Sequence, residues 1–75
     1  MEVPRDTDGM IKLSVLEHDI DAALASNPDR EQTILVRDEN EKKIIEEYFD
    51  HDTYVVESKK STGKKYKLTI GAAGF

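Results

Sequence analysis

The spacing of apolar residues switches between two patterns along this 75-residue chain, and that alternation limits the folds open to it. In residues 11–15 every second residue is apolar, which is typical of a strand with one buried face. In residues 16–24 the apolar residues recur at helical spacing. Asn27-Pro28 ends this predicted helix, because the residue before a proline avoids helical backbone angles. The chain therefore starts with a predicted strand and a short helix.

A second strand and a second helix are predicted next. Residues 33–37 are a β-branched run with apolar side chains on both faces, which favours a central strand. Asp38 precedes Glu41 by three residues, which is the spacing of a capping box at the start of a helix. The helix predicted after Asp38 has a charged face opposite an apolar stripe made of Ile44, Ile45, Tyr48 and Phe49.

Two strands close the predicted fold. Residues 53–58 have the composition of a strand, and apolar residues alternate with polar ones in residues 65–70. The Lys-Lys-Ser-Thr-Gly-Lys-Lys stretch between them supplies a turn, with Gly63 free to take a positive φ. The predicted order is β-α-β-α-β-β, an α+β two-layer sandwich with two helices packed on one face of a four-stranded mixed sheet.

The length predicts a single α+β domain over residues 10–71. Residues 1–9 contain almost nothing apolar, so we expect a flexible arm or an added extension, with Met10 as a candidate original start. Residues 72–75 are expected to form a flexible tail. The predicted core consists of the apolar positions that the two spacings select: Ile11, Leu13, Val15, Ile20, Leu24, Ile34, Val36, Ile45, Phe49, Val55, Leu68 and Ile70.

The chain has no cysteine, which excludes disulfides, thiol nucleophiles and zinc ribbons. It also has no apolar run long enough to span a bilayer and no signal-peptide pattern at its start. We therefore expect no membrane contact and a cytoplasmic location.

Residues 23–70 resemble the TusA/SirA family of small sulfur-carrier proteins in element order and loop length. Residues 33–38 are similar to the second strand of that family, residues 39–52 to its second helix, and residues 54–70 to its closing hairpin. The resemblance implies a β-α-β-α-β-β fold. The C-terminal domain of translation initiation factor three, which binds ribosomal RNA, has the same element order, and one fold hosts several functions.

Sulfur transfer in the TusA/SirA family depends on a Cys-Pro-x-Pro motif at the start of the first helix. The corresponding stretch of this chain is Leu16-Glu17-His18-Asp19-Ile20-Asp21, which has neither cysteine nor proline. The resemblance therefore carries over no sulfur-transfer activity and no site residue.

Basic residues are concentrated in the predicted hairpin. Five of the 11 lysines and arginines lie there: Lys59, Lys60, Lys64, Lys65 and Lys67. The rest of the chain has six basic and 16 acidic residues, a formal net charge of −10. The lysines, with the neighbouring Ser61 and Thr62, are candidates to contact a phosphate or an RNA backbone. The other interpretation is that they keep an edge hairpin soluble.

The second predicted helix presents an acidic surface. Its candidate contact residues for a protein partner are Glu39, Glu41, Glu46 and Glu47. We expect a non-enzymatic binding or regulatory domain that acts through a protein partner, as a monomer or a weak dimer. RNA or phosphate binding through residues 59–67 is the alternative function.

Two clusters contain the side-chain types of a metal or acid–base site. His18 and Asp21 lie three residues apart on the first predicted helix, and Asp50-His51-Asp52 follows the second. Both clusters also suit a helix end, where charges interact with the helix dipole. Because neither has the spacing of a known metal site and no serine has a nucleophile motif, we predict no catalytic residue, no cofactor and no metal.

Tyr54 and Tyr66 lie on the two strands of the predicted hairpin, where cross-strand pairing is one arrangement open to them. On an exposed face they would form a platform on which RNA bases stack beside the lysines. On the buried face they would belong to the core, and this is the arrangement we expect, because Tyr66 shares its face with Leu68 and Ile70.

Overall fold

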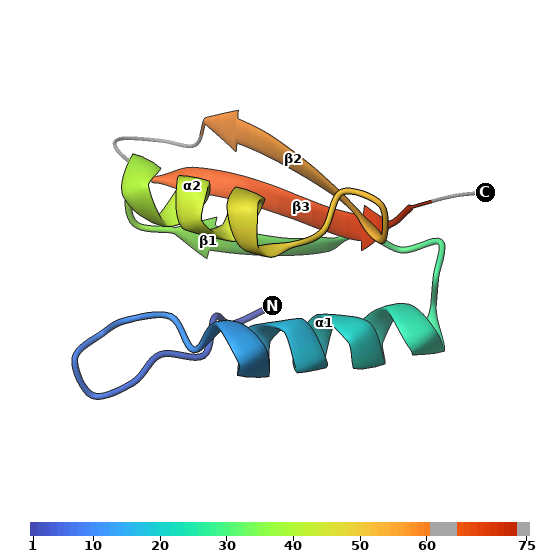
Figure 1. Cartoon of the computed structure of the whole chain (residues 1–75), viewed down its shortest axis with the longest axis horizontal. Helices are drawn as coiled ribbons and strands as arrows, with labels where there is room; N and C mark the ends of the chain where they lie inside the picture. The colour runs from blue at the N-terminus through green and yellow to red at the C-terminus, as the bar shows by residue number, and fades with distance from the viewer. Residues whose placement is uncertain (61–64, 74–75) are drawn as a thin grey trace.

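The computed structural model describes residues 1–60 and 65–73 (Figure 1). The order of elements is α1 (Leu13–Ser26), β1 (Gln32–Val36), α2 (Glu39–Tyr48), β2 (Tyr54–Lys60) and β3 (Tyr66–Ala72). The chain is thus an α+β protein in which both helices pack on β1 and β3. The turn predicted around Gly63 lies outside the described residues, as do the last two residues of the predicted tail.

The three strands form one antiparallel sheet in the order β1-β3-β2. The prediction of a four-stranded mixed sheet is therefore wrong. The prediction that residues 33–37 are a central strand is also wrong, because β1 lies at one edge and β2 at the other. The last strand is central because β3 pairs with β2 as a hairpin on one side and with β1 on the other.

Residues 13–15 of the first predicted strand belong to a helix instead. Leu13, Leu16 and Ile20 continue the apolar stripe of α1 back toward the N-terminus, so the helix begins at Leu13. Val15 falls off this stripe and is 43% exposed. Only Ile11 makes a β contact, an isolated antiparallel bridge with Arg5. The end of α1 at Ser26, directly before Asn27-Pro28, is confirmed.

The buried side chains of the sheet lie on the face that the helices cover. Ile34 is paired with Leu68, and Val56 with Ile70, so these side chains point to the same side of the sheet. They form one core with buried residues of the two helices and of the C-cap of α2: Leu16, Ile20, Leu24, Ile45 and Phe49.

Eight of the 12 predicted core residues are buried, and four are not. Val15 and Val55 are exposed, while Ile11 and Leu13 are partly buried and pack against the core. The prediction missed Leu16 and Tyr54, both of which are buried. Val55 is exposed because it alternates with Tyr54 and Val56 on β2, and in this register the even-numbered residues face the helices.

Helix α2 begins as predicted. The Asp38 side chain accepts a hydrogen bond from the backbone N–H of Glu41, with a donor–acceptor distance of 2.9 Å. At the other end, the ring of Phe49 meets that of Tyr54 edge-on at 5.0 Å between centroids. The first contact caps the N-terminus of α2, and the second packs its C-terminal end against the sheet.

The segment of residues 1–9, expected as a flexible arm, lies against the body of the protein. Val3 packs on the core, and the Arg5 guanidinium contacts Glu41 of α2. A turn with Gly9 at φ 82° reverses the chain, so that Lys12 N–H donates to the carbonyl of Pro4. At the C-terminus, Ala72 belongs to β3 and Ala73 N–H donates to the Thr53 carbonyl, so these residues of the predicted tail are paired with β2 and its preceding loop.

Candidate functional site

The face of the sheet opposite the helices carries exposed aliphatic side chains together with exposed lysines. We call it the open face, and its residues are Thr33, Leu35, Val55, Glu57, Lys59, Lys67 and Thr69. They occupy the odd-numbered positions of the three strands, which point away from the core. The strand register arranges them in rows, with Leu35, Lys67 and Lys59 in one row and Thr33, Thr69 and Glu57 in the next.

The open face holds two lysines directly opposite each other. Lys59 of β2 pairs with Lys67 of β3, and both side chains are exposed. Like charges in directly opposed positions destabilise a sheet. None of the ion pairs in residues 1–60 and 65–73 involves Lys59 or Lys67. This pair therefore costs stability and presents concentrated positive charge to the solvent.

Two apolar side chains lie on the same face. Leu35 is 52% exposed and Val55 is 45% exposed. Leu35 stands in the row of the two lysines, and Val55 lies on β2 opposite Gly71. An open sheet face that combines exposed aliphatic side chains with lysines that form no ion pair among the described residues has the composition of a contact surface.

The remaining hairpin lysines are only partly described. Lys60 lies on β2 opposite Tyr66, and Lys65 is exposed just before β3. Lys64, Ser61 and Thr62 lie outside the described residues. The structure thus brings Lys59 and Lys67 together on one face.

The two hairpin tyrosines are not cross-strand neighbours. Tyr54 pairs with Ala72 and Tyr66 pairs with Lys60, at opposite ends of the β2–β3 ladder. Both are at even-numbered positions and lie on the helix-covered face, where Tyr54 is buried and Tyr66 packs against the core. Tyr66 also lies under the Lys42 ammonium, 5.6 Å from its ring centroid. The open face consequently offers no stacking platform made of these rings.

Tyr54 also makes a polar contact from the core to α1. Its hydroxyl donates a hydrogen bond to the Asp21 carboxylate. Burial, together with this carboxylate, raises the pKa of Tyr54. Asp21, a candidate metal ligand in the sequence, is thereby engaged in joining α1 to β2.

Tyr54→Phe is expected to lower the free energy of unfolding by about 1 kcal/mol, because it removes this hydrogen bond and keeps the buried ring. Urea denaturation measures the change. Asp21→Asn serves as the companion variant, since it retains an acceptor for the hydroxyl and should lose less. Equal stability of Tyr54→Phe and the wild type would show that the hydrogen bond contributes nothing.

The acidic surface predicted on α2 is smaller than expected. Glu39 and Glu47 are exposed, whereas Glu46 is half-buried and lies 3.6 Å from the Lys42 ammonium. Glu41 was predicted on the exposed, charged face, but it is 5% exposed. Its position on the helix turns it toward the arm and β1, so it is not available to a partner.

Glu41 is the centre of an ion network that joins three segments of the chain. The Arg5 guanidinium donates to both carboxylate oxygens, at 2.7 and 3.1 Å. The backbone N–H and the guanidinium of Arg37 donate to the same carboxylate. The hydrogen bond from Arg5 is the largest cause that lowers the pKa of Glu41, to about 2 from its ordinary 4.5, and Arg37 adds to it against the cost of burial.

The sequence analysis missed Arg5 and Arg37 as partners of Glu41. Arg37 lies four residues before Glu41, at a spacing that suits an ion pair. Arg5 lies 36 residues away, and no local pattern connects the two. A local sequence pattern therefore points to Arg37 as a partner of Glu41, and no such pattern points to Arg5.

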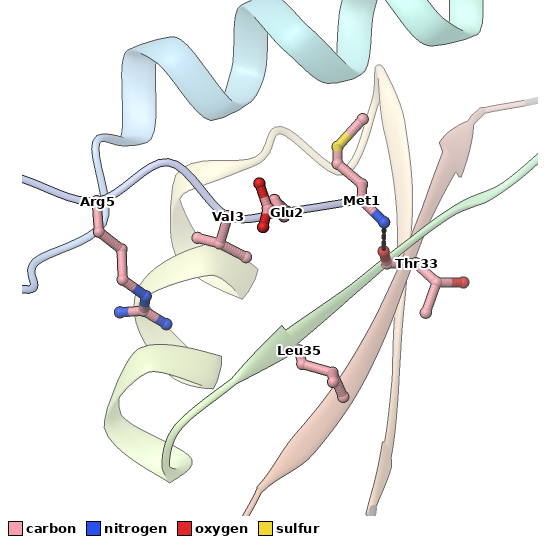
Figure 2. Close-up of a pocket in the computed structure, with 6 residues that line it drawn as sticks. All are labelled: Met1, Glu2, Val3, Arg5, Thr33 and Leu35. Atoms are coloured by element: carbon pink, nitrogen blue, oxygen red, sulfur yellow. Dashed lines mark hydrogen bonds between the residues drawn. The ribbon is translucent and has the colours of Figure 1, made fainter.

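The arm also borders a depression at the outer edge of β1. Figure 2 shows Met1 above Thr33, whose backbone carbonyl accepts a hydrogen bond from the Met1 amino group at 3.1 Å. The depression has a volume of about 570 Å³ and is lined by Met1, Glu2, Val3, Arg5, Thr33 and Leu35. The arm thus lies beside one edge of the sheet and next to the open-face residue Leu35.

The two histidine-containing clusters remain separate. His18 is exposed on α1, and Asp50-His51-Asp52 forms a turn in which the Asp50 carboxylate accepts hydrogen bonds from Asp52 N–H and the Thr53 hydroxyl. No three histidine or acidic side chains come together as a metal site within the described ranges. In the same part of the chain, neither helix has the length and apolarity needed to cross a bilayer.

Comparisons with models of protein families, with curated proteins and with solved structures give no match for this chain.

Proposed function

We propose that this protein is a small binding domain that acts through a protein partner, and that the partner contacts the open face of the sheet. The observation that carries the proposal is the row of Leu35, Lys67 and Lys59, which places an exposed aliphatic side chain beside two lysines that form no ion pair within the described residues. A partner segment with acidic and apolar side chains complements this row in charge and in polarity.

The acidic surface of α2 is a weaker candidate for the partner contact than the open face. Only Glu39 and Glu47 of its four candidate residues are exposed. They lie eight residues apart on α2, which separates them by about 12 Å along the helix axis. Two isolated carboxylates contribute little specificity, because exposed charges are screened by salt.

RNA or phosphate binding is a second candidate, favoured by the direct opposition of Lys59 and Lys67. Two lysines this close attract a phosphate group. Against it, both hairpin tyrosines lie on the helix-covered face, so bases have no aromatic ring of the hairpin on which to stack. The acidic balance of the rest of the chain would also repel a polyanion.

The double variant Leu35→Ser/Lys67→Glu tests the proposal, because it replaces the aliphatic contact and inverts a charge on the open face. Tagged wild-type and variant proteins are used to recover partners from lysate, with and without nuclease. We expect the wild type to recover a defined set of proteins that resists nuclease and that the variant loses. Circular dichroism should show that the variant is folded, since both side chains are exposed.

Glu39→Gln/Glu47→Gln is the matched control on α2, with a charge change of two units, equal in size and opposite in sign to that of the open-face variant. It should retain the partners that the open-face variant loses. If the control loses them instead, the acidic helix is the contact surface. If nuclease removes them, and fluorescent single-stranded RNA binds with a salt slope that Lys67→Gln flattens by about one, the RNA candidate replaces the proposal.

A further inference from the structure

Strand β2 forms an open edge of the sheet. Both helices pack mainly on β1 and β3, so the helix layer leaves β2 at its margin. The opposite edge, on β1, has the arm beside it, with the Met1 amino group bonded to the Thr33 carbonyl. The seven-residue strand β2 is therefore the edge with room for another strand.

The hydrogen bonds of β2 show which of its backbone N–H and C=O groups point out of the sheet. Tyr54 N–H donates to the Asp50 carbonyl, outside the sheet, so the backbone groups of Tyr54 point away from β3. In an antiparallel ladder this orientation alternates, so Val56 and Ser58 also point outward while Glu57 and Lys59 point toward β3. Among residues 1–60 and 65–73, no hydrogen bond from a loop or side chain reaches the outward groups of Val56 or Ser58.

The sequence of β2 is complementary to itself. When two copies of β2 pair antiparallel with Ser58 opposite Ser58, Glu57 of each copy lies directly opposite Lys59 of the other. The two serines then exchange backbone hydrogen bonds at the two-fold axis. The Glu57 and Lys59 positions form non-hydrogen-bonded pairs, in which opposed side chains come closest. Both side chains are exposed on the open face, so each ion pair forms without disturbing the core.

Other registers lack this match. Pairing Glu57 with Glu57, or Lys59 with Lys59, brings like charges together, which destabilises a sheet. Pairing Val56 with Val56 places Glu57 opposite Val55 and leaves both charges unmatched. The charge pattern thus selects one register.

We propose that this protein forms a symmetric dimer through the β2 edge, with Glu57 of each subunit opposite Lys59 of the other. The two sheets join into one continuous sheet of six strands, and the interface is closed by its two-fold symmetry. Lys59 gains a carboxylate, which offsets its repulsion from Lys67 within the subunit. The dimer also places the two open faces side by side. This inference goes beyond the proposed function, since it holds whether or not a protein partner binds there.

Charge exchange between the subunits tests the dimer. Glu57→Lys places two lysines opposite each other in the homodimer, and Lys59→Glu places two glutamates opposite each other. Each variant alone should self-associate about tenfold more weakly than the wild type, because both symmetry-related pairs become repulsive. An equimolar mixture of the two should recover dimerisation, since every pair is then complementary. The double variant Glu57→Lys/Lys59→Glu should dimerise by itself.

Sedimentation velocity over a wide concentration range measures these associations. Glu47→Lys and Lys43→Glu on α2 are controls with the same charge changes at exposed positions away from the edge, and both should dimerise like the wild type. Ser58→Pro removes an outward N–H and leaves the ladder to β3 intact, so it should also give monomers. The proposal is overturned if the wild type is monomeric at all concentrations, if the single variants dimerise like the wild type, or if mixing them restores nothing.

Discussion

Phe49→Ala is expected to lower the free energy of unfolding by about 3–5 kcal/mol. Phe49 is fully buried, and its ring meets Tyr54 edge-on between α2 and the sheet. Truncation removes a large apolar side chain and leaves a cavity in the layer that joins these elements. Because the domain is small, a loss of this size removes a large part of its total stability. Urea denaturation followed by circular dichroism measures the change.

The neighbouring aromatic residue provides the control. Tyr48 is 40% exposed, so Tyr48→Ala should cost about 1 kcal/mol or less. Phe49→Leu should fall between the two, because leucine refills part of the space. If Phe49→Ala and Tyr48→Ala were equally mild, α2 would pack on the sheet through another face.

Glu41→Gln is expected to lower the free energy of unfolding by about 2–3 kcal/mol at neutral pH. The substitution keeps the shape of the side chain but removes the charge that Arg5 and Arg37 bind. The pKa of Glu41 is lowered to about 2 in the folded protein, from an ordinary 4.5. A shift in this direction stabilises the folded state whenever the carboxylate is ionised in both states.

The pH dependence has a definite sign. Because the folded pKa is depressed, the stabilisation is complete above about pH 4.5 and is lost as the pH falls toward 2. The Glu41→Gln variant should therefore lose less stability than the wild type over this interval, and the two curves should converge at the acid end. Denaturant unfolding at several pH values between 7 and 2 checks this expectation.

Three further variants isolate the network. Glu46→Gln breaks the Lys42–Glu46 pair of α2 and should cost about 0.5 kcal/mol or less, because that pair is partly exposed. Arg5→Gln removes the arm's contribution, and the double variant Arg5→Gln/Glu41→Gln should be less destabilised than the sum of the single variants. Additive effects would mean that Arg5 and Glu41 do not interact in solution.

Local sequence by itself determined several elements of this protein. Asp38 satisfies a free backbone N–H at the start of α2, and proline at position 28 prevents α1 from continuing. The apolar spacing after Asp38 placed Ile45 and Phe49 in the core, and the alternation of residues 65–70 identified the strand that became β3. These features follow from interactions within a few residues, so a single sequence contains the information for them.

Tertiary structure decided the rest. Residues 11–15 have apolar spacing that suits a strand, but Leu13 continues the stripe of α1 onto the core, and burial of that stripe selects the helix. Leu35 is exposed because none of the described helices and strands covers the second face of β1, a fact that the apolar run of β1 does not reveal. Glu41 is buried because Arg5, 36 residues distant, neutralises it, and a carboxylate enters a protein interior only when such a partner comes with it.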